Sequence, residues 1–140
     1  MAQQVYPSRR KARKHAVEVG YSAIVRDADA LELLRVTALD QGWAKHPWFA
    51  YCEELVTGVQ HHADELDELV EQSSEHWSLD RMARIDLAIL RVGAWELAHN
   101  PAVPQEVAIS EAVQLAGELS TDRSGPFVNG VLAKVAGQVG

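Results

Sequence analysis

The sequence is poor in cysteine, with Cys52 alone among 140 residues, and this excludes an intramolecular disulfide framework. It also lacks the Cys and His spacings of zinc sites and the Gly-rich loops that bind nucleotide phosphates. No apolar stretch follows the N-terminus as in a signal peptide, and none approaches the ~18 residues of a membrane span. We therefore expect one cytoplasmic domain over residues 1–140, with no cofactor, no metal and no membrane contact.

Strand signals are also missing, because no segment alternates convincingly between apolar and polar residues. Apolar residues instead recur at three- and four-residue steps, which is typical of helices that bury one face. Helices are predicted from Ser8 for roughly five turns, between Asp29 and Gly42, from Trp48 to Glu75 with a break around 61–64, and over Ile85–Leu97, Val107–Leu119 and Phe127–Val139. The pattern predicts an all-α, compact bundle of about seven helices, with Ile85–Leu97 at its centre and residues 1–7 disordered.

Positive charge is concentrated near the N-terminus of a chain whose net charge is -7. Five of the thirteen basic residues stand within six positions, namely Arg9, Arg10, Lys11, Arg13 and Lys14. On a helix they form i,i+4 rows, at the end where the helix dipole disfavours cations. This placement indicates a localised anion-binding surface, and a solvated, unstructured basic arm is the alternative.

Residues suited to catalysis or metal binding are few. The only ligand-like cluster is formed by His61, His62, Asp64 and Glu65, in which His61 and Glu65 have the i,i+4 spacing that can chelate a metal. Without a further ligand at a telling spacing, a solvated helix face is the preferred interpretation. Cys52 lies on an apolar stripe and is predicted to be a buried, unreactive thiol. The tryptophans are expected to fill core volume. We therefore predict that the protein is not an enzyme.

Three strings of the second half occur in a telling order: "IDLAILRVGAWEL" (85–97), "VPQEVAISEAVQLAGELS" (103–120) and "FVNGVLAKV" (127–135). Together with "RRKARKHAVEVGYS" (9–22) they resemble the NusB family of bacterial transcription antitermination factors. The resemblance implies an all-α fold of two small helical subdomains and no catalysis. It also implies binding to the boxA element of nascent ribosomal RNA, together with the ribosomal protein that acts as NusE. Other Nus factors and RNA polymerase complete the implied antitermination complex.

The resemblance also implies roles for individual residues. Phosphate contacts are expected from the basic start of the first helix, that is from Arg9, Arg10, Arg13 and Lys14. Bases would be read by Phe127 and Asn129, since single-stranded RNA is recognised by stacking and by hydrogen bonds to base edges. Core packing at a helix start is an equally good interpretation of Phe127. Gly130 is expected to allow close helix packing.

A second surface is implied for the protein partner. Tyr21 and Asp86 match family positions that face NusE, and an acidic surface suits a basic ribosomal protein. Arg91 and Glu96 also match family positions, but an ion pair inside the bundle explains them equally well.

Departures from the family pattern leave part of the function open. Gly117 and Pro126 stand where relatives usually have basic residues, and Ser110 replaces an asparagine. RNA binding by the isolated chain is therefore expected to be weak. One alternative function is an RNA-binding module of this fold that acts with a methyltransferase in ribosomal RNA maturation. Another is a protein-interaction module without RNA binding. A homodimer is also possible, because periodicity does not separate interface residues from other exposed apolar residues.

Overall fold

The computed structural model describes residues 7–75 and 77–140, and no strand occurs in these ranges. The α-helices are α1 (Pro7–Arg26), α2 (Ala30–Gln41), α3 (Phe49–His61), α4 (Ala63–Ser73), α5 (Arg84–His99), α6 (Gln105–Leu119) and α7 (Ser124–Val139). Two short 3-10 helices, η1 (Trp43–Lys45) and η2 (Leu79–Arg81), lie in the connections. The predicted all-α class is confirmed. None of the described helices has the length and apolar character needed to cross a membrane.

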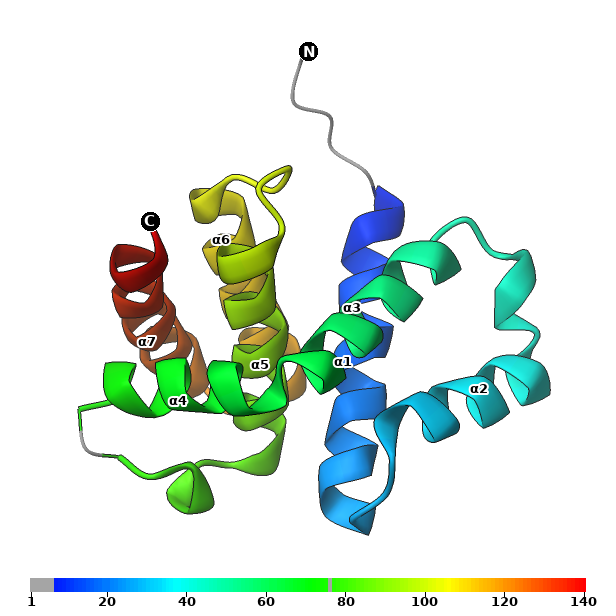
Figure 1. The fold of residues 1–140 in the computed structure, drawn as a ribbon, viewed down its shortest axis with the longest axis horizontal. Helices are drawn as coiled ribbons and strands as arrows, with labels where there is room; N and C mark the ends of the chain where they lie inside the picture. Colours follow the sequence, from blue (N-terminus) through cyan, green and yellow to red (C-terminus); the bar gives the residue numbers. More distant parts are fainter. Residues whose placement is uncertain (1–6, 76) are drawn as a thin grey trace.

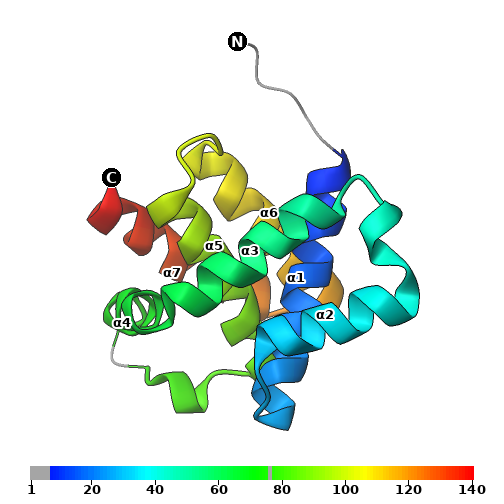
Figure 2. The same ribbon diagram turned by 45° about the vertical axis from the view of Figure 1, so that its right-hand side comes forward.

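The helices form two groups that meet along α1 and α5 (Figure 1). In the first group α1 packs against α2 and α3, and in the second α7 packs against α4, α5 and α6. The turned view in Figure 2 shows α5 behind α3 and between the two groups. This arrangement confirms the two expected subdomains. It also confirms that the most apolar segment is central, because residues 86–96 of α5 are buried at every position except Arg91.

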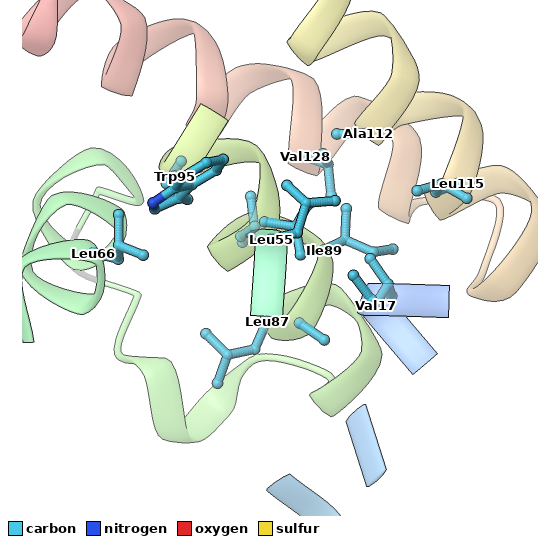
Figure 3. Close-up of a cluster of buried hydrophobic side chains, with 14 of the residues drawn as sticks. Val17, Leu55, Leu66, Leu87, Ile89, Trp95, Ala112, Leu115 and Val128 are labelled. Carbon is cyan, nitrogen blue, oxygen red and sulfur yellow. The ribbon is translucent and has the colours of Figure 1, made fainter. Parts of the chain in front are cut away.

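The core is continuous from one subdomain to the other. Figure 3 shows buried side chains of α1, α3, α4, α6 and α7 meeting those of α5. The labelled side chains include Val17, Leu55, Leu66, Ile89, Leu115 and Val128, one from each of these helices. Burying a side chain of this size contributes about 1.5–3 kcal/mol to folding. The position of α1 relative to α5 is therefore fixed by packing.

Local sequence signals explain most of the helix ends. The Asp29 carboxylate accepts a hydrogen bond from the Glu32 backbone N–H at 3.0 Å, and Gly42 ends α2 in the left-handed conformation at φ 68°. The break predicted around 61–64 lies at His62, between α3 and α4. At the N-terminus, the disorder predicted for residues 1–7 concerns residues outside the described ranges, apart from Pro7, which begins α1.

The last helix begins earlier than predicted, at Ser124 instead of Phe127. Pro126 lies in its first turn, where backbone N–H groups have no helical acceptor, so the proline costs no hydrogen bond.

Two glycines allow close packing in the core, and they are not the one predicted. A Cβ atom on Gly58 would lie 2.2 Å from the indole Nε1 of Trp95, and one on Gly93 would lie 2.7 Å from a methyl carbon of Leu132. Gly130 is exposed, and a Cβ there would meet nothing within 4 Å. The close-packing role predicted for Gly130 is therefore wrong.

Candidate functional site

The basic start of α1 is divided between the core and the surface. α1 is helical throughout its basic segment, so successive side chains point in different directions around the axis. Arg13 is buried, Arg9 and Lys14 are half-buried, and Arg10 and Lys11 are exposed. The five cations therefore do not form one uniform surface.

Arg13 points into the protein. Its side chain is 6% exposed, and its Nε lies 3.0 Å from each carboxylate oxygen of the buried Glu96. The Tyr51 hydroxyl donates a hydrogen bond to the same carboxylate, and the Asn100 amide donates to the Tyr51 oxygen at 3.0 Å. The sequence placed Arg13 among exposed phosphate ligands, and the structure corrects this. The guanidinium lies against Glu96 because a buried charge needs a charged partner.

The protonation states in this network follow from its surroundings. Burial by itself lowers the pKa of Arg13, but the charge and hydrogen bonds of Glu96 outweigh burial and raise it. Burial, and then the charge of Glu96, raises the pKa of Tyr51 far above its ordinary value. The Tyr51 hydroxyl therefore remains a hydrogen-bond donor, and Arg13 remains a cation.

Arg10 and Lys14 form a row on the surface that faces α6. Arg10 donates to both carboxylate oxygens of Glu111, from Nε at 3.1 Å and from Nη2 at 2.8 Å. Lys14 Nζ lies 4.0 Å from Glu118 Oε1, and Glu118 is two turns after Glu111 on α6. The hydrogen bond from Arg10 holds the pKa of Glu111 below its ordinary value. Because the side chains of Arg10 and Lys14 are about half exposed, at 54% and 42%, these pairs are open to exchange with other anions.

Aromatic rings adjoin the basic segment on the side away from α6. The Arg9 guanidinium lies over the Tyr51 ring, 4.5 Å from its centroid. Further along α1, the His15 ring stacks on Trp48 with centroids 4.4 Å apart. The exposed His46 also stacks on Trp48, with centroids 5.3 Å apart. Rings of this kind are the platforms on which unpaired bases stack.

The string "WAKHPW" (43–48) contains two tryptophans and a histidine within six positions, which indicates an aromatic cluster. The prediction that the tryptophans only fill core volume did not include this cluster. Trp48 is indeed buried, but Trp43 is half-buried and lies edge-on to Trp48 at 5.1 Å. Burial lowers the pKa of His15, and the nearby charges of Lys11 and Lys14 act in the same direction. The His15 ring is therefore neutral at pH 7 and suited to stacking.

Phe127 and Asn129 belong to α7, in the other subdomain. Phe127 is half-buried and packs against the core, which agrees with the packing interpretation, whereas Asn129 is exposed. Among the described residues no hydrogen bond, ion pair or ring contact joins either one to the basic side chains of α1. Contact of these two residues with bases stays a prediction.

The two residues predicted to face a protein partner differ in exposure. Tyr21 is 39% exposed, and Val25, one turn further along α1, is 56% exposed. Asp86 is 7% exposed, in the first turn of α5, and its Oδ2 accepts a hydrogen bond from Ser124 Oγ at 3.0 Å. The structure thus corrects the expectation of an exposed charge at Asp86. Its carboxylate is held at two helix N-termini, where negative charge is favourable.

Arg91 and Glu96 each form an ion pair within the bundle, but with different partners and not with one another. Arg91 forms a bidentate pair with Asp67 of α4, at 2.8 and 3.0 Å, and Glu96 pairs with Arg13. The first pair joins α4 to α5, and the second joins α1 to α5.

An all-α domain with a cationic and aromatic surface on its first helix is typical of a nucleic-acid-binding module, and no arrangement of catalytic groups accompanies it among the described residues. The NusB family model matches residues 10–137. The chain belongs to the NusB family.

Named relatives agree with this assignment over nearly the whole chain. The transcription antitermination protein NusB of Clavibacter sepedonicus is 46% identical over 134 residues, which cover 92% of this chain and 96% of the relative. The NusB protein of Myxococcus xanthus is 40% identical over 132 residues, which cover 92% and 94%. Both are antitermination proteins by name, which agrees with the prediction that this chain is not an enzyme.

Solved structures share the fold. The NusB structure of T. maritima superposes with a TM-score of 0.84 at 29% identity, covering 96% of this chain and 94% of that one. A structure of the antitermination factors NusB and NusE in complex with dsRNA superposes with a TM-score of 0.85 at 25% identity, covering 96% and 99%.

Proposed function

We propose that this chain is a transcription antitermination factor that binds RNA together with a NusE-type ribosomal protein. Membership of the NusB family and the likeness to a NusB chain solved with NusE and dsRNA support this function. The observation in this chain that carries it is the surface of α1, where Arg10 and Lys14 lie partly exposed on the side facing α6 and stacked aromatic rings adjoin the other side. A factor of this kind acts on nascent bacterial transcripts, and its place of action is the cytoplasm.

The RNA strand follows the start of α1 in this proposal. Arg9, Arg10, Lys11 and Lys14 supply phosphate contacts, and the rings of Trp43 and His46 supply faces for unpaired bases. Asn129 and Phe127 extend the surface on α7. Arg13 contributes by holding α1 against α5. The boxA element is the proposed RNA, as expected from the family resemblance.

The partner protein docks on the C-terminal half of α1, around Tyr21 and Val25. These two exposed apolar side chains stand four residues apart and therefore lie on one face of the helix. Asp86 is buried and holds the start of α7 through its hydrogen bond with Ser124, so in this proposal it does not contact the partner itself. A partner docked on this face would place its own basic residues on the same RNA strand and raise the affinity of the pair.

A titration of labelled boxA RNA and of a scrambled RNA tests the RNA surface. Arg10→Ala should weaken RNA binding and lower the slope of log affinity against log salt by about 0.7 for a lost phosphate contact. Arg35→Ala is the matched control, because Arg35 is 61% exposed and also pairs with a glutamate, Glu32, but lies on α2. Equal losses in the two variants would contradict the proposed surface.

A gain of affinity gives a sharper test than a loss. Glu111→Gln removes the acidic partner of Arg10 and should raise RNA affinity, by up to about fivefold if the exposed pair is worth at most ~1 kcal/mol. Unchanged or weaker RNA binding in this variant would show that Arg10 does not contact the strand.

The partner face is tested separately with purified NusE-type protein. Tyr21→Ala should weaken partner binding in calorimetry and leave RNA binding by the isolated chain unchanged, whereas Val36→Ala, 54% exposed on α2, should affect neither. A chain that binds the partner but no RNA in any combination would instead be a protein-interaction module.

A further inference from the structure

Three side chains with metal-binding chemistry converge where α3, α4 and α5 meet. His62 lies at the junction of α3 and α4, Glu65 in the first turn of α4, and His99 in the last turn of α5. One oxygen of Glu65, Oε1, lies 3.2 Å from His62 Nδ1 and 3.0 Å from His99 Nε2. The three ligand atoms all lie within 4.8 Å of one another.

The sequence identified His62 and Glu65 as members of a ligand-like cluster, but it gave the chelating geometry to His61 with Glu65. His61 and Glu65 have i,i+4 spacing, but in the structure His61 is exposed and Glu65 contacts His62, three residues before it. The third donor, His99, is 34 residues further along the chain, so sequence spacing gave no indication of it. The fold therefore supplies the further ligand whose absence argued against a metal.

The distances between these ligand atoms suit a metal ion with tetrahedral coordination. A zinc ion about 2.0–2.2 Å from imidazole nitrogen and carboxylate oxygen holds neighbouring ligand atoms roughly 3.3 Å apart. Both distances to Glu65 Oε1 are close to this value. The two imidazole rings are stacked, with centroids 3.9 Å apart and planes 23° apart. Because His χ2 is a soft torsion, a rotation of the rings brings both nitrogen lone pairs toward one point.

We propose that His62, Glu65 and His99 bind a divalent transition-metal ion, with Zn²⁺ the best match to two imidazoles and one carboxylate. The side chains are 40%, 48% and 29% exposed, so water can complete the coordination. Asp64, exposed beside Glu65, adds negative charge, and the C-terminal end of α5 favours a cation at His99. The nearest described guanidinium on α5, Arg91, is neutralised by Asp67.

A bound ion would join the two subdomains. His62 ends α3, which packs against α1, whereas His99 ends the central helix of the other group. The ion would hold the α3–α4 corner against the end of α5. None of the three proposed ligands belongs to the residues proposed to contact RNA on α1.

The test uses the full chain without an affinity tag, because a histidine tag would itself bind metal. Zn²⁺ titrated in a calorimeter, and Co²⁺ followed by its visible absorption, should each bind with a stoichiometry of one. His99→Gln and Glu65→Gln should each weaken binding by about tenfold or more. His61→Gln is the matched control, because it removes an adjacent, exposed imidazole outside the cluster and should leave metal affinity unchanged.

The outcomes separate cleanly. All four side chains are at least partly exposed, so the variants should fold, and circular dichroism checks this. Zn²⁺ should also raise the melting temperature of the parent chain and of His61→Gln, but not that of His99→Gln. Absence of binding by the parent chain, or equal binding by all variants, would overturn the proposal and leave the cluster as a set of hydrogen bonds to Glu65.

Discussion

Replacing Arg13 by alanine is expected to destabilise the protein far more than replacing Arg10, although both arginines belong to the same basic segment. Loss of Arg13 leaves the Glu96 carboxylate, 1% exposed, without its cation and with the Tyr51 hydroxyl as its remaining described donor. Breaking a buried ion pair in this way costs about 3–5 kcal/mol. The exposed pair between Arg10 and Glu111 is worth about 0–1 kcal/mol.

The difference in stability between Arg13→Ala and Arg10→Ala should be large enough to measure easily. A domain of this size typically has a total stability of about 5–15 kcal/mol, so Arg13→Ala removes a substantial part of it. One kcal/mol corresponds to about 3–4 °C in melting temperature at this chain length, which gives a decrease of roughly 10–20 °C for Arg13→Ala. Arg10→Ala should lower the melting temperature by no more than about 4 °C.

Urea unfolding followed by tryptophan fluorescence provides the measurement, since Trp95 is buried in the core. A third variant, Arg13→Met with Glu96→Leu, removes both charges and should recover most of the lost stability, because apolar replacements fill the space without an orphaned charge. If Arg13→Ala unfolds at the same urea concentration as Arg10→Ala, the buried pair between Arg13 and Glu96 does not stabilise the fold more than the surface pair, and the reasoning is refuted.

Three further results are expected. The hydrogen bond from Arg10 lowers the pKa of Glu111 below 4.5, so the stability that it confers is present above pH 4.5 and is lost on acidification through the lowered pKa. The difference in urea midpoint between the parent chain and Glu111→Gln should therefore disappear as the pH falls through this range. Burial raises the pKa of Cys52 to about 12, so a thiol reagent should label it only in unfolding concentrations of urea. Gly58→Ala should cost about 1–3 kcal/mol by overlap with a core indole, whereas Gly130→Ala should stabilise by about 0.4–1 kcal/mol in thermal melts.

The fold was predictable because its signals are local. Helix caps such as Asp29 and Gly42 act within one turn, and apolar periodicity identifies which face of each helix is buried. The start of α7 was missed because Ser124, Gly125 and Pro126 favour a turn when read alone. The Asp86 carboxylate, 38 residues earlier, accepts a hydrogen bond from Ser124 and helps to fix that start, which a local reading does not detect.

The candidate site was less predictable, because the charge of a side chain does not show whether it points into the core or toward solvent. Arg13 stands four residues before the buried Val17, so the apolar stripe of α1 already included its position. What the local sequence did not give is its partner, since Glu96 is 83 residues away. The same limit applies to His99 and to the buried carboxylate of Asp86, whose surroundings depend on elements distant in the chain.

The burial of Arg13 bears on how the remaining cations work. Together with core packing, its two hydrogen bonds to Glu96 keep one face of α1 against α5, and this orientation decides where the neighbouring side chains point. Arg10 and Lys14 are thereby held over α6, in exposed pairs whose small free energies let a phosphate replace the carboxylate. A strong buried pair thus positions weak exposed ones. In the proposed function, the basic segment would therefore bind RNA with fewer charges than the sequence displays, and a partner that adds cations to the same strand would have correspondingly more to contribute.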